Sequence, residues 1–210
     1  RDISTALYEL GGILFVYDAF CSHDVDGLKK ALKDVKDGTF SYRDETPRSN
    51  HPRNILYELI VAGSLKNSGL PIDIANIEDV QTQVENRTVF IECKRPQNGK
   101  RAEKLLRAAL DQLDTRYKRS TDANSLGIVS LSLDKVINPE LLTARYESQN
   151  EFDSALEHAC KAVVMPILAK WSNQKRAPRI VSRRTIGVQT TVRIPVVLAE
   201  INTKVSLGYN

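Results

Sequence analysis

Alternating hydrophobic and polar residues are clearest near the middle of the chain. Residues 80–84 alternate strictly, and after a short polar break residues 88–91 continue with β-branched and aromatic side chains. A period of two is typical of strands, so the two stretches predict a β-hairpin. Side chains alternate between the faces of a strand, so Glu92 and Lys94 are expected to share one face and Cys93 to lie on the other.

Helical periodicity flanks this hairpin on both sides. Apolar residues recur at spacings of three and four along several stretches, and each of these predicts an amphipathic helix. Gly11-Gly12 is expected to interrupt or weaken the first helix, and Pro166 to kink the last. The expected helices cover residues 3–20, 24–36, 52–69, 100–118 and 150–171.

Further strands are expected at residues 71–77, 126–133 and 186–207, the last with a break at Pro195. Strands and helices that alternate in this way predict an α/β domain with helices on a central sheet. The expected organisation is one core with additions at both ends, the C-terminal one packed on the same domain. The segments are an N-terminal helical extension at 1–46, the core at 47–172, and a basic segment with C-terminal strands at 173–210.

Composition limits the expected partners and the expected location of the protein, but it does not indicate an activity. The chain has 210 residues, 41% hydrophobic and 27% charged, with a net charge of +4 that allows a polyanionic partner. Its three cysteines form no C-x-x-C pair, which predicts a reducing, cytoplasmic location, and no apolar run approaches the ~18 residues that a membrane span needs. The chain begins at Arg1, so further domains or subunits are left open, as is a homo-oligomer.

One acidic residue falls on or beside an apolar helical stripe. Glu58 has Ile55, Val61 and Ala62 as neighbours three or four positions away. A buried carboxylate needs a partner, because desolvating an isolated one is very costly. Glu58 is therefore either part of a site or a glutamate at the edge of the stripe that reaches water.

Asp79, a twelve-residue gap and then Glu92-x-Lys94 resemble the motif of the PD-(D/E)XK nuclease superfamily. The resemblance covers about residues 50–135, although Glu78 stands where the family has a proline. It implies a restriction-endonuclease-like fold, in which a mixed central sheet is flanked by helices. The implied order is a helix with an acid, a hairpin with the aspartate and Glu-x-Lys, a second helix and a further strand.

The resemblance also implies a magnesium site, with Mn²⁺ as a substitute. Asp79 and Glu92 would hold the metal, and Glu58 and the Cys93 carbonyl are further candidate ligands; the carboxylates are expected to converge. Lys94 would orient the water or stabilise the transition state. Gln112 is implied as a polar residue that faces the site, and Asp73 is the alternative to Asp79.

The function implied is hydrolysis of phosphodiester bonds in nucleic acid, with DNA favoured over RNA and an endonuclease over an exonuclease. Restriction, antiviral defence, repair and mobile-element processing are the settings that the resemblance suggests. The alternatives are a non-catalytic nucleic-acid-binding or protein-binding scaffold of the same fold, and an interaction domain in which the motif is coincidental. Basic residues expected to contact nucleic acid, or else to form a solvated surface, are Lys100, Arg101, Lys104, Arg107, Lys175, Arg176, Arg183 and Arg184.

Overall fold

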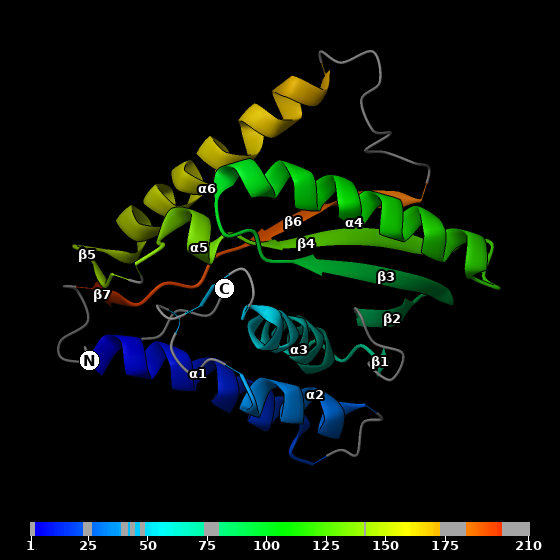
Figure 1. The fold of residues 1–210 in the computed structure, drawn as a ribbon, viewed down its shortest axis with the longest axis horizontal. Coiled ribbons are helices and arrows are strands. Elements are labelled where there is room, and N and C mark those ends of the chain that lie inside the picture. The colour runs from blue at the N-terminus through cyan, green and yellow to red at the C-terminus, as the bar shows by residue number, and fades with distance from the viewer. Residues whose placement is uncertain are drawn as a thin grey trace.

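A mixed five-stranded sheet, with strand order β1-β2-β3-β4-β6, forms the centre of the protein (Figure 1). β1 and β2, and β2 and β3, are antiparallel neighbours, whereas β3, β4 and β6 run parallel. The strands are β1 (Ile72–Asp73), β2 (Val80–Val84), β3 (Arg87–Lys94), β4 (Leu126–Ser132) and β6 (Thr185–Thr191). The computed structural model describes residues 3–22, 27–38, 42, 45–46, 49–73, 80–140, 142–172 and 184–198.

Helices cover both faces of the sheet, so the expected α/β class is confirmed. On one face α3 packs on the strands and carries α1 and α2 on its outer side; α4 and α6 cover the other face. A small second sheet pairs β5 with β7. The remaining elements are α1 (Ile3–Phe20), α2 (Leu28–Lys36), α3 (His51–Asn67), α4 (Gly99–Arg119), α5 (Asp134–Ile137), β5 (Ala144–Tyr146), α6 (Gln149–Ser172) and β7 (Val196–Leu198).

The hairpin between β2 and β3 turns over two residues. Glu85 and Asn86 both have positive φ angles, 48° and 64°, and two consecutive residues of this kind make the tight turn that suits the twist of a hairpin. The turn sets the register, in which Val84 faces Arg87 and Val80 faces Ile91. This register determines which side chains of β3 face α3 and which face α4.

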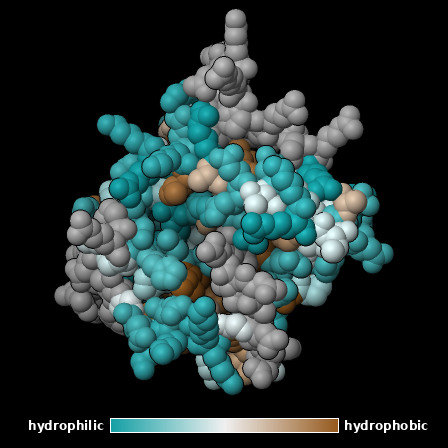
Figure 2. Space-filling view, turned by 45° about the vertical axis from the view of Figure 1, so that its right-hand side comes forward, coloured by the Kyte–Doolittle hydropathy of each residue, from teal (hydrophilic) through white to brown (hydrophobic). Residues whose placement is uncertain are grey.

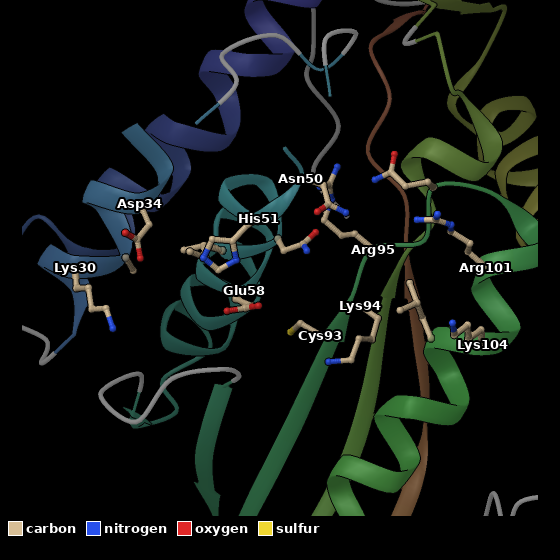
Figure 3. Close-up of a pocket in the computed structure, with 15 residues that line it drawn as sticks. Lys30, Asp34, Asn50, His51, Glu58, Cys93, Lys94, Arg95, Arg101 and Lys104 are labelled. Atoms are coloured by element: carbon tan, nitrogen blue, oxygen red, sulfur yellow. The ribbon is translucent and has the colours of Figure 1, made fainter. Parts of the chain in front are cut away.

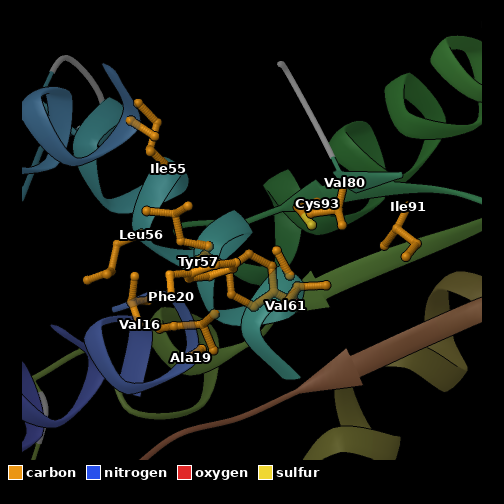
Figure 4. Close-up of a cluster of buried hydrophobic side chains, with 14 of the residues drawn as sticks. Val16, Ala19, Phe20, Ile55, Leu56, Tyr57, Val61, Val80, Ile91 and Cys93 are labelled. Atoms are coloured by element: carbon orange, nitrogen blue, oxygen red, sulfur yellow. The ribbon is translucent and has the colours of Figure 1, made fainter. Parts of the chain in front are cut away.

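Two hydrophobic cores separate the layers. The core on the α3 side of the sheet joins α1, α3 and the hairpin, and it contains Cys93 and Ile91 from β3 (Figure 4). The core on the α4 side of the sheet joins α4, α6 and β4. α4 lies so close to β4 that a Cβ at Gly127 would come within 2.1 Å of the Tyr117 hydroxyl, so only glycine fits there. The face of the molecule seen in Figure 2 is mostly hydrophilic over its described residues, in keeping with this internal packing.

Hydrogen bonds fasten α3 and α1 to the rest of the chain. The Tyr57 hydroxyl of α3 lies 2.7 Å from the hydroxyl oxygens of Ser130 and Thr191 on the neighbouring strands β4 and β6. On α1, the buried Glu9 carboxylate pairs with Arg53 at 2.5 Å and accepts a hydrogen bond from the Tyr42 amide at 2.6 Å. Burial raises the pKa of the Tyr57 hydroxyl, so it stays protonated and neutral.

Several elements differ from those expected. α1 is continuous through Gly11-Gly12. The lack of a side chain at Gly12 lets Arg193 and Ile60 pack closely against the helix at this point, and this packing supports the helix across the glycines. β1 covers Ile72–Asp73, and residues 74–77 of the expected strand lie outside the described residues. α5 and β5 are additional short elements, and Pro195 separates β6 from β7 as expected. Among the described residues, no helix has the length and apolar character that crossing a membrane requires.

Candidate functional site

Glu92 lies at the C-terminal end of β3 on the face that meets α4. Its side chain is fully buried, yet both carboxylate oxygens have cationic partners. The Lys94 ammonium donates to one oxygen at 3.1 Å, and the Arg116 Nε donates to the other at 2.5 Å. Burying a carboxylate is costly unless it is paired and hydrogen-bonded, and these two cations offset that cost.

Arg116 reaches Glu92 from α4, one helical turn after Gln112. Its guanidinium also lies 6.0 Å from the centre of the Phe90 ring, the β3 residue two positions before Glu92. Sequence reasoning missed Arg116. The available signal was its i+4 spacing from Gln112, which places both residues on one face of α4.

A cavity of about 850 Å³ opens on this side of the hairpin. Glu92, Gln112 and Arg116 all line it, so the predicted glutamate and glutamine do share one cavity. Gln81 of β2 lines it as well, and Gln81 pairs with Phe90 across the hairpin. Gln112 and Arg116 therefore line the cavity beside Glu92, while the apolar face of α4 packs in the core.

A second cavity, of about 650 Å³, lies at the end of β3 between α2, α3 and α4 (Figure 3). Glu58, Cys93 and Lys94 contribute to its wall. Cations outnumber acids in the lining, which suits an anionic ligand. The basic residues of the lining are Lys30, Lys94, Arg95, Arg101 and Lys104, and its acidic residues are Asp34 and Glu58.

The residue after Lys94 fixes the end of β3. Arg95 is buried and forms a two-point ion pair with the buried Glu45, with N–O distances of 3.0 and 3.2 Å. Gln97 donates to the same carboxylate at 2.9 Å. Burial lowers the pKa of Arg95, but the charge and the hydrogen bonds of Glu45, together with Asp134 and Tyr8, raise it above its ordinary value, so the guanidinium stays charged. The backbone beside Lys94 is thus held by a buried ion pair.

The two predicted glutamates line different cavities. Glu92 faces α4, whereas Glu58 is on α3, which packs against the opposite face of β3 beside Cys93. Lys94 connects the two, since it lines the cavity of Glu58 and binds the carboxylate of Glu92. Asp79 lies outside the described residues, and its alternative Asp73 is exposed on β1 opposite Gln81.

The donor chemistry suits a hard cation. The Glu92 carboxylate and the Cys93 carbonyl are oxygen donors of the kind that Mg²⁺ prefers, and Mg²⁺ is commonly held by one or two carboxylates. Within the described part of the chain, which excludes Asp79, no three His, Cys, Asp or Glu side chains are grouped to hold a metal ion. Both oxygens of Glu92 are engaged by cations, so a metal would take the place of Arg116 or Lys94.

All but one of the predicted nucleic-acid contacts fall into three groups. Lys100, Arg101 and Lys104 are exposed at the start of α4, where the Asn98 side chain caps the helix by accepting from the Arg101 amide at 3.0 Å. Arg107 pairs with Glu103 at 3.0 Å. The third group, Lys175, Arg176 and Arg183, lies outside the described residues.

Arg184, the remaining predicted contact, joins the end of α4 to β6. Its guanidinium donates to the Tyr117 carbonyl at 3.1 Å and to the Ala123 carbonyl, and it lies over the Tyr117 ring. These contacts give Arg184 a structural role in the described molecule. Comparison of the chain with models of protein families, with curated proteins and with solved structures finds no significant match.

Proposed function

We propose that the chain is a metal-dependent nuclease that hydrolyses phosphodiester bonds, with DNA favoured over RNA and internal cleavage over cleavage from an end. The observation that carries the proposal is the buried Glu92 carboxylate, paired with Lys94 at the end of a hairpin strand. The order α3, hairpin, α4 and parallel β4 supports it, because the restriction-endonuclease-like fold requires this order around the motif.

Asp79 and Glu92 would hold Mg²⁺, with the Cys93 carbonyl as a further ligand, whereas Glu58 lines the other cavity and would serve only a second ion there. The bound ion would polarise the phosphoryl oxygen and lower the pKa of a bound water. Lys94 is positioned beside Glu92 to stabilise negative charge that develops on the phosphate during attack. Arg101 and Lys104, on the wall of the second cavity, would bind the flanking phosphates of the strand.

The direct test is incubation of the protein with labelled DNA and RNA, with Mg²⁺, with Mn²⁺ and with EDTA. The proposal expects cleavage of DNA only in the presence of metal, with internal products from a circular substrate. Absence of cleavage of every substrate under saturating metal would contradict it.

Salt dependence should reveal whether Arg101 and Lys104 contact phosphates. Each phosphate that a protein neutralises on duplex DNA contributes about 0.9 to the log–log slope of affinity against salt. Arg101→Ala combined with Lys104→Ala should therefore flatten the slope by about 1.8. Lys118→Ala, an exposed cation at the other end of α4, is the matched control and should leave the slope unchanged. Equal slopes for the double variant and the wild type would remove both residues from the interface.

A non-catalytic nucleic-acid-binding module is the second candidate, and one observation favours it. Arg116 occupies an oxygen of Glu92 that a metal would need, with a contact of 2.5 Å. If this ion pair is permanent, Glu92 holds α4 on the hairpin and does not bind metal. Thermal melting of an Arg116 variant distinguishes the two candidates.

Arg116→Ala should destabilise the metal-free protein by about 2 kcal/mol, less than for a fully broken buried pair because Lys94 remains. For a chain of this size the melting temperature in EDTA should fall by roughly 4–8 °C. A nuclease site would recover most of this loss in Mn²⁺, because metal replaces the missing charge beside Glu92. Arg119→Ala, on the same cavity wall, should change neither value. An equal loss in EDTA and in Mn²⁺ would favour the binding module.

A further inference from the structure

α1 presents hydrophobic side chains on two opposite faces. Its inner face is buried, with Val16, Ala19 and Phe20 in the core that α1 shares with α3. Its outer face carries five large hydrophobic residues exposed to solvent. Their exposed fractions are 37% for Leu7, 46% for Leu10, 40% for Ile13, 58% for Leu14 and 65% for Tyr17.

The exposed residues form one continuous stripe. Leu7, Leu10, Leu14 and Tyr17 follow spacings of three, four and three, and at 100° per residue they and Ile13 fall within a sector of about 120°. Alternating spacings of three and four form the seam along which two helices pack side by side. A helix that is hydrophobic on all sides is normally buried on all sides.

The chemistry of the stripe limits its partner. Between Ala6 and Tyr17 the outer face carries no charged side chain, because Glu9, the one charged residue of that stretch, is buried against Arg53. A nucleic-acid surface needs lysine or arginine, and a helix that lies on a membrane normally carries them along its polar face. The stripe lacks both, so it suits a hydrophobic protein surface.

We propose that two copies of this chain pair through the outer faces of α1. The five side chains expose on the order of 500 Å² per copy, so a symmetric pair buries about 1,000 Å², the threshold of a specific interface. A two-fold interface requires a surface that matches itself, and an uncharged stripe meets its copy without like-charge repulsion. A single exposed patch of this size already lies at the upper end for a monomer.

Charge at the end of the stripe sets the orientation of the pair. Asp18 is exposed directly after Tyr17. In a parallel pair the two Asp18 carboxylates would lie at the same level, whereas an antiparallel pair centred between Leu10 and Leu14 offsets them by about 18 Å along the helices. The antiparallel arrangement places Leu10 against Leu14 of the second copy and Leu7 against Tyr17.

Sedimentation velocity across a dilution series tests the pairing. The wild type should shift from monomer to dimer as its concentration rises. Leu14→Lys should raise the dimer dissociation constant by on the order of 10³-fold, because a symmetric contact contains each substitution twice. Its melting temperature as a monomer should match that of the monomeric wild type, since Leu14 is 58% exposed in a single copy.

The chain offers a matched control at Leu142, a leucine outside α1 that is 62% exposed. Leu142→Lys should leave the dissociation constant unchanged. A wild type that remains monomeric throughout the series, or a Leu142→Lys variant that dissociates as readily as Leu14→Lys, would overturn the proposal. The orientation is tested by disulfide crosslinking between copies that carry Leu10→Cys and copies that carry Leu14→Cys, both in a Cys21→Ser background. A crosslink between the two variants is expected for the antiparallel pair. A crosslink formed by the Leu14→Cys variant alone would overturn the orientation.

Discussion

Replacing Lys94 with alanine should lower metal-dependent cleavage of DNA by about 10²–10³-fold, the usual effect of removing one electrostatic contact to the transition state. Lys94 is the residue to test first because it lies between the two halves of the site. Its ammonium binds Glu92 at 3.1 Å, and its side chain also lines the cavity that contains Glu58. Steady-state cleavage of a labelled duplex at saturating Mg²⁺ is the measurement.

Stability must be separated from catalysis in this experiment, because Lys94→Ala also removes a partner of the buried Glu92. Lys94→Met preserves the length of the side chain, so it removes the charge with less loss of packing. Both variants should remain folded, since Arg116 still pairs with Glu92, and thermal melting checks this. Lys118→Ala, an exposed lysine at the far end of α4, should retain full activity. Cleavage at the wild-type rate by folded Lys94→Met would exclude the catalytic role of this lysine.

The sequence was sufficient to locate the hairpin and the faces of β3. Strict alternation at 80–84 and the Glu85-Asn86 turn specify the register locally, and this register places Glu92 and Lys94 together. The helices on either side followed from periodicity for the same reason. These features depend on residues close together in the sequence, whose geometry is fixed by the strand or helix itself.

The partners of the site residues could not be predicted in this way. Arg116 is 24 positions from Glu92, and Glu45 is 50 positions from Arg95, so neither pair leaves a local pattern. Glu58 was expected to join Glu92, but α3 and α4 cover opposite faces of the sheet, and the choice of face depends on long-range packing. The periodicity of α1 indicated a helix but not which of its two apolar faces would be buried.

The ion pair between Arg95 and Glu45 joins the residue after Lys94 to a segment far away in the sequence. Glu45 precedes α3, and its side chain is fully buried with that of Arg95 at 4% exposure. A buried ion pair contributes little net stability relative to a hydrophobic pair, but removal of one partner leaves an uncompensated charge in the interior. This asymmetry makes the pair a sensitive test of how the end of β3 is held.

Arg95→Met should therefore destabilise the protein by about 3–5 kcal/mol, the range for breaking a buried pair. For a chain of this size the melting temperature should fall by roughly 6–20 °C. The double variant Arg95→Met with Glu45→Leu should recover a large part of the loss, because it removes the stranded carboxylate as well.

Lys161→Met is the matched control: its partner Glu157 is 2.5 Å away, but both side chains are about two-thirds exposed, so the change should stay within about 0.5 kcal/mol. If the two single variants melted alike, burial of the Arg95 pair would not matter to stability. If the double variant were no more stable than Arg95→Met, the loss would come from packing around the guanidinium rather than from the isolated charge of Glu45.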